Sequence, residues 1–113
     1  MNEKKLTLFE LTEKMHDFVR SKGWYETDSK RPQTPRNLSI SLALEAAEIL
    51  EHFQWNEGFD KDELAEELAD VALYLLQLAS ISKINLEHAI LKKLEINAKR
   101  EWDLESDDSR RRA

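Results

Sequence analysis

A scarcity of chain-breaking residues constrains the fold of this sequence most strongly. Only two glycines and two prolines occur in 113 residues, and both prolines fall within residues 32–35. Glycine and proline punctuate local structure, so a chain with so few of them favours long helices and few turns. The sequence also lacks strand-like alternation of apolar and polar residues over any length. It therefore predicts an all-α fold.

The spacing of apolar residues predicts four helices. Gly23 would end the first helix, and residues 24–36 form a polar loop that contains both prolines. The later helices begin at residues suited to an N-cap, Asn37, Asp60 and Asn85, whose side chains can accept hydrogen bonds from the first turn. The predicted helices span residues 6–22, 37–55, 60–82 and 86–102.

The third predicted helix is apolar on nearly every side between Leu68 and Ala79. A helix of this kind is usually buried, and a short chain has little else with which to cover it. We therefore expect a second copy of the chain to complete a four-helix bundle, in a homodimer or a dimer of dimers. Residues 1–105 are predicted to form one domain, and residues 106–113 a flexible tail.

Composition and charge exclude several classes of protein. The chain has no cysteine, so neither a disulfide nor a thiolate metal site can form. No apolar run approaches the roughly 18 residues of a membrane span, and no signal-peptide pattern opens the chain, so a cytoplasmic protein without a membrane partner is expected. The net charge is −6, and Lys61 is the one basic residue between Arg36 and Lys83. A nucleic-acid partner bound through a basic surface is therefore not expected.

Two acidic pairs occupy matching positions on the second and third predicted helices. Glu45 and Glu48 share a helical face with Ser41 and His52, and a second face carries Glu63, Glu67, Asp70, Tyr74 and Gln77. The short turn between these helices predicts antiparallel packing. The midpoint of each acidic pair then lies roughly 13 Å from the turn, at a rise of about 1.5 Å per residue. We expect the four carboxylates to face one another.

Facing carboxylates beside an apolar bundle are costly unless a cation joins them. Such clusters can be solvated acidic faces, and lysines or arginines from other helices could also neutralise them. A divalent metal explains the spacing better, and all-oxygen ligands favour a hard ion such as Mg²⁺, for which Mn²⁺ can substitute. A di-iron site fits poorly, because it requires two inward Glu-x-x-His motifs and the sequence has one candidate, Glu13 with His16.

The order of these motifs resembles the MazG-like all-α nucleoside triphosphate pyrophosphohydrolases, and most closely their dCTP pyrophosphatase branch. The resemblance covers about residues 6–102. It rests on Trp24, PRNL at 35–38, the Glu45-x-x-Glu48 pair, FQW at 53–55 and EELADVALYL at 66–75. It implies a four-helix MazG-like fold and Mg²⁺-dependent hydrolysis of a dCTP-like or modified deoxynucleoside triphosphate to the monophosphate and pyrophosphate, which removes that nucleotide from the pool.

The resemblance also implies roles for individual residues. The metal ligands would be Glu45, Glu48, Glu67 and Asp70, and Glu48 or Glu51 would orient the attacking water. A solvated glutamate is an equally good interpretation of Glu51. Trp24 and Trp55 would flank the base, although core packing is the common fate of tryptophan. The remaining substrate-binding candidates are Tyr74, Lys93, Asn97 and Arg100.

Two departures from the family pattern leave the preferred base open. The loop between Trp24 and Pro35 is longer than in the dCTP branch and carries Gln33-Thr34 where a histidine often precedes the proline. Residues 99–102, KREW, stand in place of Arg-x-Tyr-Pro. The alternative from a different functional class is a non-catalytic helical module that senses nucleotides or binds a protein through its acidic hairpin.

Overall fold

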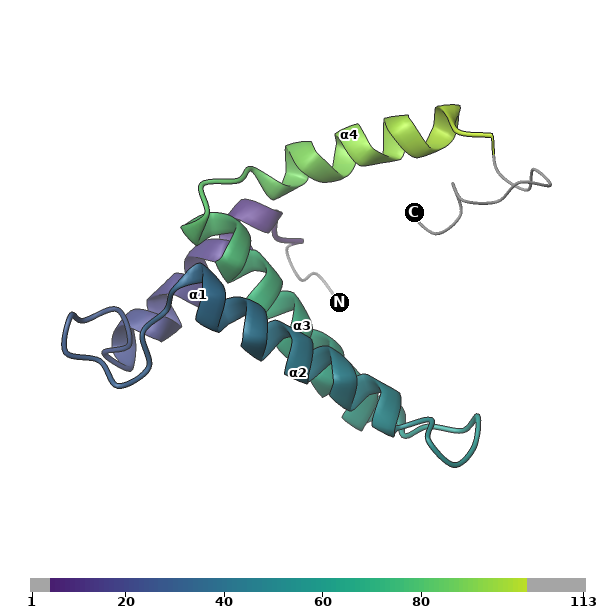
Figure 1. Cartoon of the computed structure of the whole chain (residues 1–113), viewed down its shortest axis with the longest axis horizontal. Coiled ribbons are helices and arrows are strands. Elements are labelled where there is room, and N and C mark those ends of the chain that lie inside the picture. The colour runs from purple at the N-terminus through teal and green to yellow at the C-terminus, as the bar shows by residue number, and fades with distance from the viewer. Residues whose placement is uncertain (1–4, 102–113) are drawn as a thin grey trace.

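Four helices, and no strand, make up residues 5–101, the part of the chain that the computed structural model describes. The helices are α1 (Leu8–Ser21), α2 (Pro35–Glu51), α3 (Lys61–Ile81) and α4 (Leu86–Lys99), as labelled in Figure 1. The all-α prediction is confirmed. None of these helices is both long and apolar enough to cross a membrane. Helix α4 ends at Lys99 rather than near the predicted Trp102, and Trp102 and the predicted tail lie outside the described residues.

Residues close in sequence determine where helix α1 begins and ends. A capping box opens it: the Thr7 hydroxyl accepts from the Glu10 backbone N–H at 3.0 Å, and the Thr7 N–H donates to the Glu10 carboxylate at 2.9 Å. Gly23 adopts a left-handed φ of 74° just beyond its end, as the sequence predicts. Between these ends α1 buries Met15, His16 and Val19.

The start of α2 differs from the prediction. Its N-cap is Thr34, whose hydroxyl accepts from the Asn37 backbone N–H at 3.2 Å, and Pro35 occupies the first turn. Proline suits that position because its fixed φ is helical and the missing N–H would have no helical partner. Asn37, predicted as the cap, instead donates its side-chain amide to the Pro32 carbonyl at 3.0 Å.

The end of α2 also differs, because the helix stops at Glu51 rather than near Trp55. Just beyond that end, the chain makes hydrogen bonds three residues apart, from Phe53 N–H to Leu50 O and from Gln54 N–H to Glu51 O. The connection then reverses direction, with the rings of Phe53 and Phe59 5.6 Å apart. Asp60 caps α3 as predicted, accepting from the Glu63 backbone N–H at 3.0 Å.

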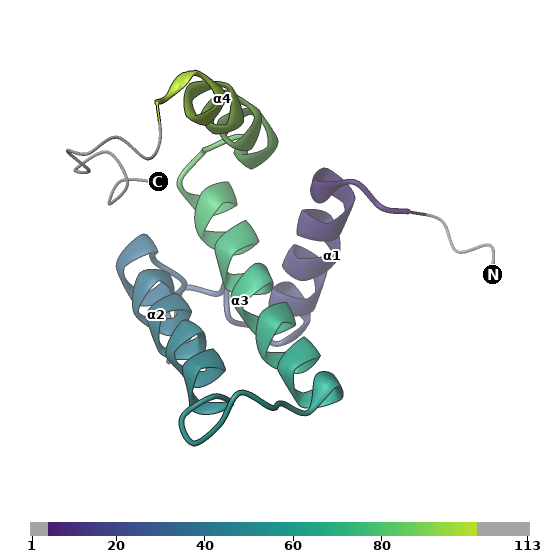
Figure 2. The same cartoon turned by 90° about the vertical axis from the view of Figure 1, so that its right-hand side faces the viewer.

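Helix α3 lies at the centre of the arrangement. Figure 2 shows it between α2, which runs antiparallel to it, and α1, which crosses its other side. The core of the described chain is small: only Met15, Val19, Leu38, Leu76 and Ala79 are buried apolar residues. Several apolar residues of α3 that the sequence predicts to be buried remain open in the single chain, and Leu68 is 52% exposed.

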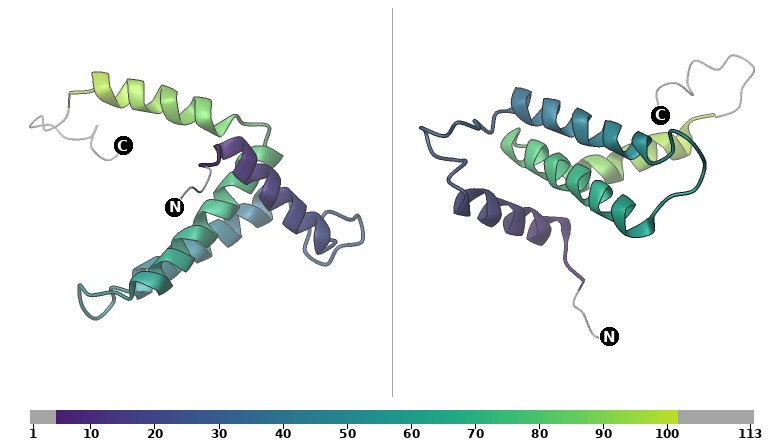
Figure 3. Two further views of the ribbon diagram at one scale, coloured as in Figure 1. Left: turned by 180° about the vertical axis from the view of Figure 1, so that it is seen from behind. Right: turned by 90° about the horizontal axis from the view of Figure 1, so that it is seen from below.

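Helix α4 extends away from the other three helices, as Figures 1 and 3 show from opposite sides. No α4 residue is buried. Its apolar side chains Leu91 and Leu94 are 57% and 59% exposed. One copy of the chain therefore presents a helix whose apolar residues have no covering surface within residues 5–101.

The turn from α3 to α4 stores backbone strain at Lys83, whose φ is +62°. The Ile84 N–H bonds to the Ala79 carbonyl at 2.8 Å, which is the pattern of a Schellman motif and favours glycine at the left-handed position. Lys83→Gly should relieve the clash with Cβ and raise the free energy of unfolding by about 0.5–1 kcal/mol. Chemical denaturation measures this, and Lys22→Gly is the control because Lys22 has a φ of −90°. Destabilisation by Lys83→Gly comparable to that of the control would contradict the strain.

Candidate functional site

Four carboxylates from two helices come together near the middle of the α2–α3 pair. One oxygen from each of Glu45, Glu67 and Asp70 lies within 4.8 Å of the other two. Glu45 lies within hydrogen-bonding reach of Asp70, and Glu48 within that of Glu67. The two acidic pairs thus lie at the same level of the antiparallel hairpin, as their sequence spacing predicts.

The surroundings of these carboxyls disfavour their charged forms. Desolvation, followed by the negative charges of Glu48 and Asp70, raises the pKa of Glu45 above its ordinary value. The hydrogen bond to Glu48 is the main cause that raises the pKa of Glu67, with desolvation and neighbouring negative charge behind it. His52 opposes this effect only in part, with its Nε2 4.0 Å from a Glu67 oxygen. The cluster holds more negative charge than its own residues neutralise.

Basic residues from elsewhere in the fold do not resolve this repulsion. Within residues 5–101, no lysine or arginine forms an ion pair with any of the four carboxylates. The donor set consists of carboxylate oxygens only, and three of them are close enough to share one ion. Hard divalent cations such as Mg²⁺ prefer these ligands. The residues present therefore fit a Mg²⁺ site.

A polar cavity of about 510 Å³ adjoins the cluster on the side of the α2–α3 turn. Glu48, Glu51, Glu63 and Glu67 all line it. Glu51, whose role the sequence leaves open, thus lies beside the carboxylates rather than on a separate face. Glu63 was not among the predicted site residues, although it shares the predicted helical face of Glu67.

A second cavity, of about 540 Å³, lies between α1, the residue 22–34 loop, α2 and α3, and we call it the Trp24 cavity. Trp24 and Phe18 form one wall with their rings nearly perpendicular and 5.8 Å apart, and the Arg31 guanidinium lies 5.5 Å from the Trp24 ring. Asp70 and Tyr74 line the same cavity. Asp70 also belongs to the carboxylate cluster, so the cavity reaches one residue of the candidate metal site.

The Trp24 cavity contains polar residues that the predicted site did not include. Lys14, Lys30 and Arg31 bring positive charge to it, and no spacing pattern in the sequence marks them. Ser41 and Gln77 also line it. Both lie on the predicted acidic faces of their helices, so the helical periodicity held enough information to find them.

Four predicted substrate-binding residues lie apart from these cavities. Trp55 is 85% exposed, because α2 ends at Glu51 and the following turn carries the ring outward. Lys93 and Asn97 belong to α4, which extends away from the α2–α3 pair, and Arg100 directly follows that helix. None of these four residues lines the polar cavity or the Trp24 cavity in one copy of the chain.

Comparisons with known proteins, by sequence and by structure, find similarity to pyrophosphatases. A model of the MazG-like family matches residues 40–112. The human protein dCTP pyrophosphatase 1 is 38% identical over 66% of this chain, and its bovine counterpart is 33% identical over the same share. The chain spans about half the length of these relatives, since the matches cover 50% of each.

A solved structure extends the similarity to the fold. The crystal structure of a pyrophosphatase from Archaeoglobus fulgidus superposes with a TM-score of 0.69 and 35% sequence identity. The match covers 86% of this chain and 94% of the archaeal one. The four-helix arrangement is therefore that of a known pyrophosphatase, and the predicted resemblance is confirmed.

The repulsion in the cluster predicts how pH and Mg²⁺ change stability. Glu45 and Glu67 have folded pKa values raised above the ordinary 4.5, so their favourable contribution is present below about pH 4.5 and is lost as pH rises through the raised values. In EDTA, the melting temperature of the wild type should therefore fall with rising pH relative to that of Glu67→Gln. At neutral pH, Mg²⁺ at tenfold its Kd should restore about 1.4 kcal/mol to the wild type.

Thermal melts with and without Mg²⁺ test this, with Glu66→Gln as the matched control. Glu66 is exposed and adjacent in sequence, and it lies outside the cluster. It should behave as the wild type. An equal response of wild type and Glu67→Gln to both pH and Mg²⁺ would show that the cluster carries no mutual repulsion and binds no ion.

Proposed function

Because the chain belongs to the MazG-like family, we propose that it is a Mg²⁺-dependent nucleoside triphosphate pyrophosphohydrolase that releases the monophosphate and pyrophosphate. One observation carries the proposal: Asp70 belongs both to the carboxylate cluster and to the wall of the Trp24 cavity. A ligand in that cavity would have one end at a site suited to Mg²⁺. A nucleotide has the matching form, an aromatic base joined to metal-binding phosphates.

Particular residues of the chain would bind the metal and the substrate. Glu45, Glu67 and Asp70, with Glu48 behind Glu67, would hold Mg²⁺. When bound, the ion supplies charge neutralisation for the phosphates and lowers the pKa of a coordinated water. Trp24 offers an aromatic face on which any base can stack. Tyr74, one turn beyond Asp70, is placed to hydrogen-bond the sugar or a phosphate.

Glu48 and Glu51 are the candidates for orienting the attacking water. Both line the polar cavity, which gives water access to the side of the cluster away from Trp24. A carboxylate there can accept a proton from water as the bond to phosphorus forms. Glu48 is hydrogen-bonded to Glu67, whereas Glu51 is exposed, so Glu51 is the one free to turn toward a water.

The cations of the Trp24 cavity favour a charged ligand over a neutral nucleoside. Lys14, Lys30 and Arg31 all line it, within a chain whose net charge is −6. The names of the human and bovine relatives point to dCTP as the first substrate to try, and modified deoxynucleoside triphosphates are the next group. Removal of such nucleotides from the cellular pool is the role we propose.

Substitution within the cluster tests the reaction. Glu48→Gln and Asp70→Asn preserve shape and remove a charge, and each should lower kcat/KM for dCTP by about 100-fold or more while helical circular dichroism is unchanged. Product analysis by ion-exchange chromatography should show dCMP and pyrophosphate with Mg²⁺, and neither product in EDTA. Glu66→Gln is the control and should retain wild-type turnover.

Three results would overturn the proposal. Release of inorganic phosphate and dCDP would refute the assigned cleavage position. Full activity in the Glu48→Gln, Asp70→Asn double variant would refute the assignment of these residues as metal ligands. Absence of turnover across a panel of nucleoside triphosphates, together with a melting temperature that responds to nucleotide, would favour the nucleotide-sensing module instead.

We also propose that the active protein is a homodimer or a dimer of dimers. Within residues 5–101 one chain buries few apolar residues and none of α4, and Leu68 of α3 and Leu94 of α4 are 52% and 59% exposed. Exposed apolar area of this extent marks an interaction surface. A second copy laid against α3 and α4 would cover it. It would also bring Lys93 and Asn97 of α4, and Arg100 at the end of that helix, nearer to a nucleotide site than the single chain does.

A charge placed on α4 tests the assembly. Leu91→Glu and Leu94→Glu should shift the mass seen by light scattering from a multiple of the chain mass of 13.3 kDa toward the single-chain value. Lys92→Glu, on the same helix, reverses a charge without removing an apolar contact and should keep the assembly intact. A wild-type protein with a single-chain mass at micromolar concentration would contradict the proposal.

A further inference from the structure

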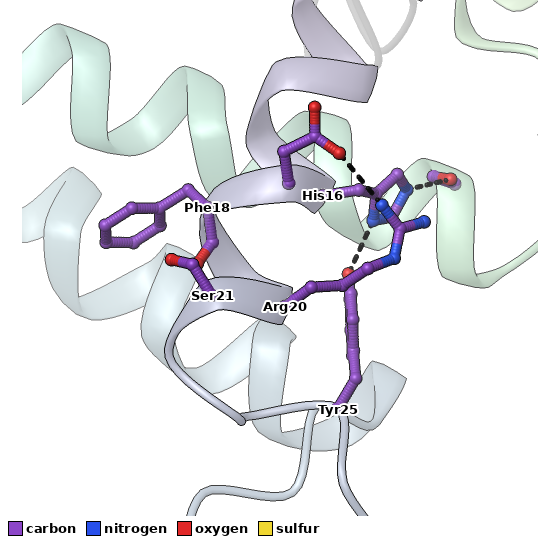
Figure 4. A network of polar contacts seen from close by, with 7 residues as sticks. His16, Phe18, Arg20, Ser21 and Tyr25 are labelled. Atoms are coloured by element: carbon purple, nitrogen blue, oxygen red, sulfur yellow. Dashed lines mark hydrogen bonds and ion pairs between the residues drawn. The ribbon is translucent and has the colours of Figure 1, made fainter.

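A polar relay runs beneath the Trp24 cavity, linking α1, the residue 22–34 loop and α3. Figure 4 shows its start, where His16 points from α1 to Tyr25. The His16 Nδ1 lies 2.6 Å from the Tyr25 hydroxyl, and its Nε2 lies 2.7 Å from the Ser80 hydroxyl. The Tyr25 hydroxyl then accepts from the Gln77 side-chain amide at 3.2 Å. The same amide donates to the Gln33 carbonyl oxygen at 2.7 Å.

The direction of the protons along this relay follows from the groups present. Burial, and then the charge of Arg20, lowers the pKa of His16, so its ring is neutral at physiological pH. A neutral ring has one donor and one acceptor nitrogen. If Nδ1 accepts from Tyr25, then Nε2–H donates to Ser80, and each hydroxyl has a partner. The opposite assignment would leave the Tyr25 proton with no acceptor among the contacts described.

This arrangement fixes what Gln77 presents to a ligand. Its amide donates one hydrogen to Tyr25 and the other to Gln33, and Gln77 is only 3% exposed. No hydrogen bond within residues 5–101 uses its Oε1, and Gln77 lines the cavity. A flipped carboxamide would set its oxygen against the Gln33 Oε1, and the 2.7 Å hydrogen bond between the two side chains would be lost. Gln77 therefore offers an acceptor and no donor.

Gln33 supplies the complementary group beside it. Its Oε1 accepts from Gln77, and its Nε2 donates one hydrogen to the Arg31 carbonyl at 2.6 Å. The second hydrogen of that amide remains for a ligand, and Gln33 also lines the cavity. The floor of the Trp24 cavity thus has an acceptor and a donor side by side. Elsewhere the walls are largely apolar, with Met15, Val19 and Leu73 among them.

We infer that Gln77 and Gln33 read the edge of the base, and that they select a base with an exocyclic amino group beside an unprotonated ring nitrogen, as in cytosine or adenine. This inference rests on the proposed function, since it places the base in the Trp24 cavity. The amino group would donate to Gln77 Oε1, and the ring nitrogen would accept from Gln33 Nε2. Carboxamides read adenine in DNA through the same pairing of groups.

The deaminated bases fit this floor less well. In uracil and hypoxanthine a carbonyl replaces the amino group and the ring nitrogen carries a hydrogen, so donor and acceptor are exchanged. In the same pose the carbonyl would face Gln77 Oε1, and two N–H groups would face each other. To pair its N–H with Gln77, a deaminated base would have to shift by one hydrogen-bonding position, and this would draw its phosphates away from the carboxylate cluster.

Paired substrates test this inference. The ratio of kcat/KM for dCTP over dUTP, and for dATP over dITP, should each be about tenfold or more in the wild type. Gln77→Met keeps the length of the side chain and removes its acceptor, and should reduce each ratio to about threefold or less. Gln33→Met, on the loop, should do the same and guards against a folding defect from the buried substitution. Gln54→Met is the control, because Gln54 is exposed and lines neither cavity, and should keep the wild-type ratios.

Tyr25→Phe tests the relay without removing a group that contacts the base. It removes the acceptor that holds the Gln77 amide, so that the carboxamide can turn, and both ratios should fall although no base-contacting atom is lost. Ratios near unity in the wild type, or ratios that stay at the wild-type level in both glutamine variants, would overturn the inference.

Binding measurements keep this test distinct from that of the reaction. Calorimetric titration with the non-hydrolysable α,β-imido forms of dCTP and dUTP gives the same comparison without catalysis. Tighter binding of the dCTP form with no hydrolysis of dCTP would overturn the proposed reaction and support the base readout. Hydrolysis of both nucleotides with equal binding of both analogues would support the proposed reaction and overturn the base readout.

Discussion

Mutual repulsion among four carboxylates on the α2–α3 pair is the constraint on which the account of this protein depends. The acidic pairs face each other at one level of the hairpin, with Glu45 against Asp70 and Glu48 against Glu67. No lysine or arginine of residues 5–101 pairs with them. Such an arrangement weakens the fold unless a cation binds, and this links the stability of the hairpin to the chemistry that we propose for it.

The residue 22–34 loop connects that chemistry to the choice of ligand. It places Trp24 on the wall of a cavity that reaches Asp70, and it carries Gln33 to a hydrogen bond with Gln77 on α3. The buried contact of His16 with Tyr25 fixes the same loop to α1. The reaction and the base preference therefore depend on different parts of the molecule, the acidic hairpin and the loop, which meet at one aspartate.

How much the sequence predicts depends on whether a feature is local. The Asp60 cap and the level of the two acidic pairs follow from helical spacing alone, and the structure confirms both. The Asn37 cap was wrong because the helix begins three residues earlier, where the Thr34 hydroxyl accepts from the Asn37 N–H itself and Pro35 occupies the first turn. The Gln33–Gln77 contact joins residues 44 positions apart, and no periodic pattern in one sequence reports such a pairing. The positions of Trp55 and α4 relative to the site depend on surfaces that one chain does not cover.

The most direct test of the central claim is to locate a metal ion in the protein. Crystals grown with Mn²⁺, which shares the oxygen ligands of Mg²⁺, can be measured at a wavelength where manganese scatters anomalously. We expect an anomalous peak bounded by the carboxylates of Glu45, Glu48, Glu67 and Asp70, and we expect this peak to be lost in Asp70→Asn. A fully occupied manganese elsewhere with none among these four residues, or no bound manganese at millimolar concentration, would contradict it.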